Sequence, residues 1–296
     1  MGRLMQTGHR TERTIAGLPG VECPVSVLFQ KLALWLCAFL IAALSAGGAQ
    51  AQTITIDPAS AVEAAASSVN MNHTVGTGSN RLVLVSVAIE RNDASVTSVT
   101  YAGQPLGLLG RLTDPGGGAT LEIWGRLGPN SGTNQVAVSL SNNAAVVVGA
   151  ISFANVDQNN PFAAFQLFSA SSGTTASGTV ASTAEQLVIG TIAANDQVGS
   201  VTAGAGQTSR WNVVNAADVI GAGSTRNGAA GSTAMSYTFA NSGRWVLGVI
   251  AIQQANPLVV INTNDTGAGS LRNAIDFANT QATPSTISFA IPGAGP

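Results

Sequence analysis

The chain has 296 residues, and only 9% of them are charged, against about 25% in ordinary soluble domains. The formal net charge of −2 provides no basic surface of the kind that nucleic-acid binding requires, so we expect no nucleic-acid partner. Because 45% of the residues are hydrophobic, the chain can bury a core, and extended disorder is not expected.

Residues 1–51 have the features of a secretory signal peptide. Residues 32–46 form an uncharged apolar run, basic residues precede it, and Ala49-Gln50-Ala51 fits an A-x-A cleavage site. The run is shorter than the roughly 20 residues needed to span a bilayer. We therefore predict export, cleavage after Ala51 and a secreted or bacterial cell-surface location, with membrane contact only through the signal peptide. An uncleaved anchor is the alternative.

The chain after Ala51 contains few reactive side chains. It has no cysteine, no lysine and one histidine, His73. This inventory mostly excludes cysteine nucleophiles, Schiff bases, histidine triads and multi-histidine metal sites, and leaves catalysis by paired carboxylates open. We predict that the chain is not an enzyme, and this prediction does not extend to the full-length parent protein. A histidine without a second one to act with is expected on the surface or at a strand edge. The absence of disulfides favours a bacterial exported protein over a eukaryotic one.

Between residues 52 and 254, short apolar or alternating runs are separated by clusters of Gly, Ser, Thr, Asn and Asp. Their length and β-branched content predict strands at 81–89, 120–127, 135–140, 145–153, 186–192 and 244–252. Turns are predicted at 114–116, 128–130, 142–143 and 227–228. Many strands without intervening helices predict an all-β, antiparallel β-sandwich domain over 52–255.

The same region contains an internal similarity. Residues 68–93 align with 174–197, and residues 145–156 align with 244–255, at an offset of about 100 residues. Two small sandwiches fit this repeat, and so do two pseudo-symmetric halves of one jelly-roll-like sandwich. We favour one sandwich, because residues 157–161 resemble a turn more than a domain linker. The alternative is that strand-and-turn patterns alone produce the similarity.

Residues 256–296 follow a different pattern. A short strand is predicted at 258–262, and Ser270 is a good N-cap for a helix with apolar residues at helical spacing. A second strand is predicted at 285–291, with Ile287, Phe289 and Ile291 on one face.

This segment resembles the SLREAI-type opening of right-handed parallel β-helix domains in large bacterial surface proteins, both adhesin-like and of the polymorphic outer-membrane type. The matching positions are 264–265, 267, 269–272, 274–275, 278–279, 286–289 and 291–293. The family's frequent Cys before the Ser is Gly269 here, and its frequent Glu is Asn273. The resemblance covers about 39 of 296 residues. It implies that 256–296 is an incomplete N-terminal cap of a parallel β-helix, and hence that the sequence is the N-terminal part of a larger protein.

One predicted strand carries candidate binding residues. Alternation within residues 121–127 places the aliphatic side chains on one face and Glu122, Trp124 and Arg126 on the other. If the aliphatic face belongs to the core, Trp124 lies outside, where it can stack on a sugar ring with Arg126 beside it. The alternative is that a loop or a second sheet covers Trp124.

Two further aromatic residues, Trp211 and Tyr101, are candidates for glycan contact on the same grounds, with the same alternative. Trp245 lies in a strand that is apolar on both faces, so we expect it in the core.

Clusters of acidic and amide residues offer oxygen ligands of the kind that Ca²⁺ accepts. They are Asp157 with Asn159 and Asn160, Asn195 with Asp196, and Asn264 with Asp265. None has the spacing of an EF-hand, and turn formation by Asx side chains explains each of them. We therefore predict no metal and no cofactor, with Ca²⁺ as a weak alternative.

These expectations lead to a first hypothesis of a non-enzymatic exported bacterial surface or secreted module that serves adhesion or matrix interaction. Its partner would be an extracellular polysaccharide or a host or matrix surface. The alternative is the polysaccharide-binding domain of a carbohydrate-active β-helix enzyme whose catalytic part is missing from this sequence. A structural spacer without a ligand is a third possibility.

Overall fold

The computed structural model describes residues 53–91, 94–215, 218–267, 269–281, 283–291 and 293. The predicted signal peptide, 1–51, and its cleavage site lie outside these residues. The described residues all belong to one compact unit of the chain.

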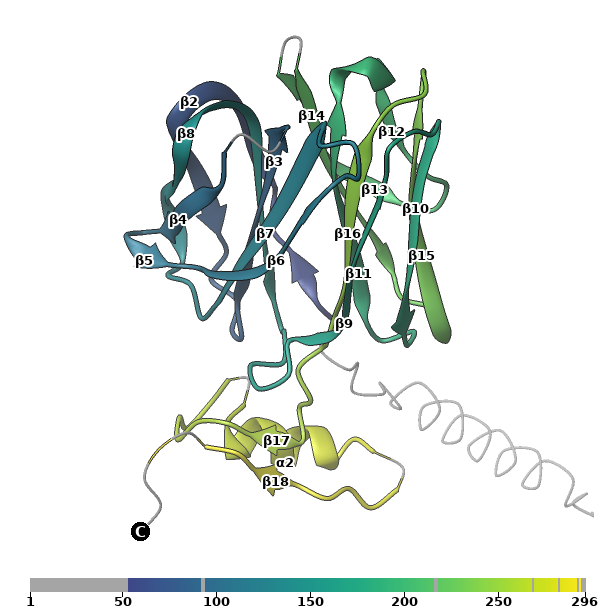
Figure 1. Ribbon diagram of the computed structural model, residues 1–296. Helices are drawn as coiled ribbons and strands as arrows, with labels where there is room; N and C mark the ends of the chain where they lie inside the picture. Colours follow the sequence, from purple (N-terminus) through teal and green to yellow (C-terminus); the bar gives the residue numbers. More distant parts are fainter. Residues whose placement is uncertain are drawn as a thin grey trace, which may run out of the picture. The chain divides into compact units, whose positions relative to one another are not determined.

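The described chain is mainly antiparallel β-structure, as the sequence predicts (Figure 1). The first half comprises β1 (Thr55–Ile56), β2 (Ser60–Val75), β3 (Leu82–Glu90), β4 (Val96–Tyr101), β5 (Gln104–Pro105), β6 (Gly107–Thr113), β7 (Ala119–Leu127) and β8 (Gly132–Ala154). The second half comprises β9 (Phe162–Ala170), β10 (Thr175–Ser182), β11 (Leu187–Asn195), the 3-10 helix η1 (Asp196–Val198), β12 (Val201–Ala203), β13 (Thr208–Asn215), β14 (Val219–Asn227), β15 (Gly231–Phe239) and β16 (Trp245–Ile252). The strand predictions at 81–89, 120–127, 186–192 and 244–252 are confirmed within one to three residues at each end.

The two halves share one pattern of strand pairing. In the second half, a five-stranded sheet, β13-β14-β11-β16-β9, lies beside a three-stranded sheet, β10-β15-β12. The first half makes the matching pairs within one sheet, because the long strands β2 and β8 pair with each other along both layers. Each half also has a bulge at the corresponding place, between Leu108 and Gly110 and between Ser209 and Trp211. The similarity seen in the sequence therefore extends to strand register.

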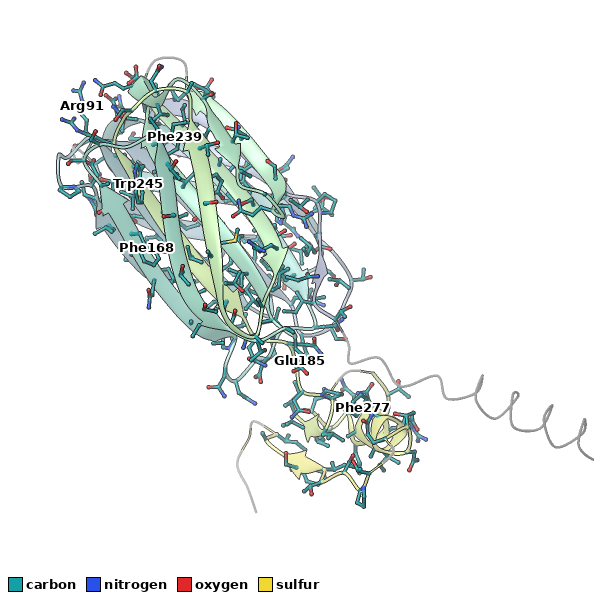
Figure 2. All side chains as sticks on the ribbon, turned by 90° about the vertical axis from the view of Figure 1, so that its right-hand side faces the viewer. Arg91, Phe168, Glu185, Phe239, Trp245 and Phe277 are labelled. Atoms are coloured by element: carbon teal, nitrogen blue, oxygen red, sulfur yellow. The ribbon has the colours of Figure 1, made fainter. Side chains whose placement is uncertain are left out.

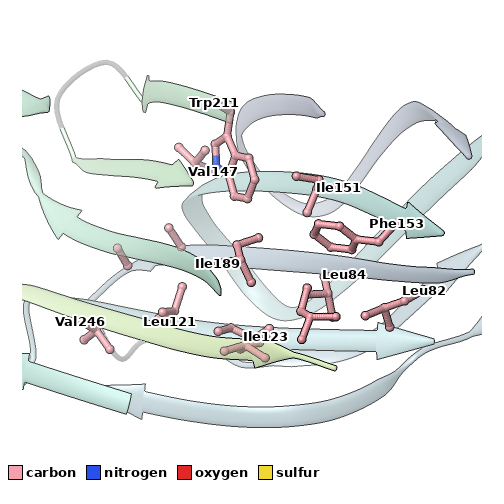
Figure 3. Packing of buried hydrophobic residues seen from close by; sticks show 14 of the residues in the cluster. Leu82, Leu84, Leu121, Ile123, Val147, Ile151, Phe153, Ile189, Trp211 and Val246 are labelled. Atoms are coloured by element: carbon pink, nitrogen blue, oxygen red, sulfur yellow. The ribbon is translucent and has the colours of Figure 1, made fainter. Parts of the chain in front are cut away.

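Three apolar clusters hold these layers together. The first-half cluster contains Val83 and Val85. The second-half cluster contains Phe239 and Trp245, and Figure 2 labels these two residues. The third, or shared, cluster lies between the large sheets of the two halves, with side chains from both (Figure 3). Strands of the large sheets are consequently buried on both faces, which explains why β3 reads as an almost unbroken apolar run.

This arrangement agrees with the alternative of two small sandwiches and not with the favoured single one. Each half has its own two layers and its own apolar cluster, and the shared cluster joins the halves. The turn predicted at Asn142-Asn143 is wrong, because β8 continues through both residues and serves both layers of the first half. The corresponding strands of the second half, β15 and β16, are separated by a loop. The turn at Asn227-Gly228 joins β14 to β15 as predicted.

The C-terminal segment contains β17 (Val259–Val260), the helix α2 (Leu271–Ala278) and β18 (Ser288–Phe289). The Ser270 Oγ atom accepts a hydrogen bond from the Asn273 amide at 3.2 Å, which confirms the predicted N-cap. β17 and β18 pair in parallel, and β18 is shorter than the strand predicted at 285–291. Among the residues that the structure describes, no helix has the length and apolarity to cross a membrane.

Candidate functional site

Two of the four predicted glycan-contact residues lie in the core, which corrects that prediction for them. Trp211 is 7% exposed and belongs to the shared cluster (Figure 3), where its indole ring occupies the space left by Gly149 and Gly223. Tyr101 is 1% exposed, and its hydroxyl donates to the Gly132 carbonyl at 2.7 Å. Neither ring can contact a ligand outside the folded protein. Trp245 is buried, as expected.

The other two predicted residues, Trp124 and Arg126, are half-buried neighbours on one face of β7. The cross-strand partner of Trp124 on β6 is Leu108, whose side chain is 50% exposed. We refer to Leu108, Trp124 and Arg126 together as the β7 strip. The strip offers an aromatic ring, an aliphatic side chain and a guanidinium group to a ligand.

A buried carboxylate fixes the indole of the β7 strip. Glu122 is 1% exposed, and its Oε2 atom accepts a hydrogen bond from Trp124 Nε1 at 3.1 Å. Its Oε1 atom accepts from Arg111 Nη1 at 2.8 Å and from the Val96 amide at 3.1 Å. Because the charge of Glu122 is paired with Arg111 and hydrogen-bonded, the carboxylate is stable in this buried position. The indole N–H is therefore already hydrogen-bonded within the protein, and the position of the ring is fixed without a ligand.

An open groove of about 390 Å³ adjoins the strip at Arg126. Its lining is largely apolar and includes Leu82, Leu109, Leu127 and Phe162. Gly107 and Gly125 lie opposite each other on β6 and β7 and also line it. This groove was not predicted, since its walls come from β3, β5, β6, β7 and β9 and no single stretch of sequence contains them.

Arg126 is held at the groove by one hydrogen bond, from Nη1 to the Pro105 carbonyl oxygen at 3.0 Å. Its guanidinium group makes no ion pair within the part of the chain that the structure describes. An arginine carries five N–H donors, so most of them are left for water or for a ligand.

His73, expected at the surface or at a strand edge, lies on β2, whose one strand partner within the described residues is β8; its side chain is 1% exposed, so the surface expectation is wrong. Its Nε2 atom lies 3.1 Å from Ser152 Oγ, and its Nδ1 atom lies 3.1 Å from Ser60 Oγ. Ser152 Oγ donates to Asp57 Oδ2 at 2.6 Å, so it accepts from His73 Nε2–H, and Nδ1 then accepts from Ser60. Burial lowers the pKa of His73 to about 4, and the negative charge of Asp57 opposes this shift only in part.

The hydrogen-bond order of this group differs from that of a Ser-His-Asp triad. In a triad the carboxylate accepts from the imidazole and the serine is open to substrate. Here Asp57 accepts from Ser152, and Ser152 is fully buried. Asp57 also accepts from the Gly76 amide at 2.8 Å. The group therefore links the segment before β2 to both β2 and β8.

The acidic and amide clusters proposed for Ca²⁺ are engaged with the protein itself. Asp157 Oδ1 accepts from the amides of Asn159 and Asn160, at 2.8 and 3.0 Å, in an Asx turn. Asn195 Oδ1 accepts from a backbone amide, and Asp265 is paired with Arg272 at 2.8 Å. Within the described ranges, no three His, Cys, Asp or Glu side chains gather in a way that could hold a metal ion.

Comparison with models of protein families finds no match for the chain, and comparison with curated proteins finds none. The geometry of the β7 strip and its groove is therefore the basis for assigning a function.

Proposed function

We propose that the chain is a non-enzymatic module of an exported bacterial surface or secreted protein, and that it serves adhesion or matrix interaction by binding an extracellular polysaccharide. The observation that carries this proposal is the β7 strip together with an apolar groove that shares only Arg126 with it; Trp124 packs against the first-half cluster and does not line the groove. Ligand sites are concave and mostly apolar, with a few polar groups that orient the ligand. An indole face and an aliphatic side chain suit the apolar face of a sugar ring, and a guanidinium suits its oxygen atoms.

The finer description of the fold belongs to the same proposal. We propose a jelly-roll-like topology for each half, supported in the second half by the order β9-β16-β11-β14-β13 in one layer and β10-β15-β12 in the other. We also propose that residues 256–296 form the opening cap of a parallel β-helix. The parallel pairing of β17 with β18 around α2 supports this, as does the 63% exposure of Phe289.

A second candidate is the polysaccharide-binding domain of a carbohydrate-active β-helix enzyme. The same groove favours it, because such a domain needs the same contacts to sugar. The two candidates differ in whether the protein that carries the module degrades the polysaccharide it binds. Incubating the native protein with a bound polysaccharide and measuring new reducing ends would separate them.

The proposal is tested by measuring binding of the purified chain to immobilised extracellular polysaccharides and matrix proteins. We expect Trp124→Ala and Leu108→Ala each to weaken polysaccharide binding by about tenfold or more, because each removes apolar contact area from the strip. Val214→Ala is the matched control, since Val214 on β13 is also 50% exposed but lies in the other half. Equal weakening by all three substitutions, or binding to none of the surfaces, would contradict the proposal.

A further inference from the structure

We propose that the groove beside Arg126 binds a sugar that carries a carboxylate, as in a polysaccharide built from uronic acids, and that the Arg126 guanidinium pairs with that carboxylate. This inference rests on the proposed function and names the chemical class of its ligand. The residues that carry it are Arg126, Phe162 and Gly107.

The charge at the groove comes from one arginine. Arg126 is the one charged side chain among the described residues that line the groove, and no carboxylate of the described chain pairs with it. Four other arginines do have acidic partners: Arg91, Arg111, Arg244 and Arg272. In a chain with so few charges, a cation without an acidic partner at the rim of an apolar groove favours an anionic ligand.

The Arg126 guanidinium has N–H donors left for a ligand. Its single hydrogen bond to the Pro105 carbonyl holds the group at the groove and leaves donors free on the remaining nitrogen atoms. Two parallel N–H groups of a planar guanidinium match the two oxygen atoms of a carboxylate. Two oxygen atoms of a sulfate can accept the same pair of N–H groups, so the test below compares the two anions directly.

The groove has room for a sugar ring. Gly107 leaves part of the groove floor without a side chain, since a Cβ added there would meet only the Gly125 carbonyl oxygen, at 3.9 Å, whereas the side chains of Leu84 and Leu109 cover Gly125. Phe162 and Leu127 supply apolar surface on the same lining. A flat ring can therefore rest on the groove while its carboxylate reaches Arg126.

The test measures binding of the full chain to polygalacturonate, alginate and hyaluronan, three polymers that contain uronic acid. Methyl-esterified polygalacturonate serves as the uncharged counterpart of the first, and dextran sulfate carries sulfate in place of carboxylate. We expect binding to at least one uronate polymer, with affinity at least about tenfold lower for its methyl ester, because hydrogen bonds to a charged group are the strong ones.

Four variants connect the binding to the groove. Arg126→Ala is expected to weaken uronate binding by about tenfold or more, and Arg126→Lys to restore only part of it, because lysine keeps the charge without the planar donor pair. Gly107→Leu is expected to block the groove. Arg226→Ala is the matched control: Arg226 also lacks an acidic partner among the described residues and donates to one backbone carbonyl, that of Ala234. It should leave binding unchanged.

The outcomes distinguish this inference from the function on which it rests. Binding to methyl-esterified or other neutral polysaccharide that depends on Trp124 but not on Arg126 would overturn the inference and leave the proposed function standing. Binding to dextran sulfate alone would overturn the carboxylate assignment. An equal loss in Arg126→Ala and Arg226→Ala would show that only general charge matters. Binding to no polysaccharide and no matrix protein would overturn both proposals.

Discussion

At the scale of single residues, the buried His73 makes the stability of the protein depend on pH. Its pKa is about 4 in the folded protein and about 6.5 in the unfolded chain. Between these values the unfolded chain binds more protons, so stability rises with pH across this window. The contribution is fully present above about pH 7 and is lost as the pH falls through about 4. A shift of this size corresponds to about 3 kcal/mol of unfolding free energy.

The measurement is urea unfolding of the wild-type protein and of His73→Asn at several pH values from 7.5 to 4. Asparagine can hydrogen-bond to Ser60 and Ser152 but does not titrate, so the variant should lose less stability over this range. All other ionisable groups are common to both proteins, so the difference between the two stability curves isolates the contribution of His73. Parallel stability curves for the two proteins would show that His73 does not contribute.

At the scale of elements, the two large sheets interlock by placing large side chains against glycines of the opposite sheet. Trp211 on β13 covers Gly149 on β8, and Ile123 on β7 faces Gly248 on β16. Gly149 and Gly248 hold equivalent positions in the repeat, paired with Ser86 on β3 and with Thr191 on β11. Each half thus contributes a large side chain that packs on a glycine of the other half, and these contacts fix the relative position of the two large sheets.

Gly149→Ala is therefore expected to destabilise the protein by about 1–3 kcal/mol, because the added Cβ overlaps with the indole of Trp211. Trp211→Leu alone should also destabilise, by leaving a cavity. In the double variant the smaller side chain makes room for the new methyl group, so its loss of stability should be less than the sum of the two single losses.

Denaturant unfolding of the three variants and of Gly107→Ala checks this expectation. Gly107 is a matched control, since it is also a strand glycine but has open space at its Cβ position, and its substitution should change stability by less than about 0.5 kcal/mol. Strict additivity of Gly149→Ala and Trp211→Leu would argue against a direct steric contact.

At the scale of the whole molecule, the repeat and the long apolar strands could be predicted from the sequence, because β-branched runs and Gly/Asn turns are local signals. β3 and β11 were found in this way, as was the N-cap of α2 at Ser270. The distribution of side chains among three cores could not be predicted. In a strand that is apolar on both faces, such as β3, the sequence does not indicate which side chains face the first-half cluster and which face the shared cluster.

The candidate site was predicted in part, for the same reason. Alternation within β7 correctly paired Trp124 with Arg126 on one face, because that pattern lies within a single strand. The burial of Trp211 depends on Gly149, which lies on another strand in the other half. The burial of His73 depends on Asp57, Ser60 and Ser152, which come from separate segments. Such long-range partners leave no local signal in one sequence.

The shared cluster is expected to couple the unfolding of the two halves. Because it joins two halves that have cores of their own, we expect β1–β16 to unfold in one cooperative transition. Val83 and Val188 provide a matched pair of probes: they hold equivalent positions on β3 and β11, both are fully buried, and each lies in the cluster of its own half. Val83→Ala and Val188→Ala each remove about two methylene equivalents, worth about 2–3 kcal/mol.

We expect both substitutions to lower one common midpoint, by about 2–4 °C for each kcal/mol lost. Thermal unfolding followed by near-ultraviolet circular dichroism reports on both halves at once, through Trp124 in the first and Trp245 in the second. Two separate transitions, with each substitution shifting only one, would mean that the halves fold independently and that the shared cluster is a weak interface. A common shift in both variants would mean that the large sheets, packed through Trp211 and its glycine partners, make the two repeats one folding unit.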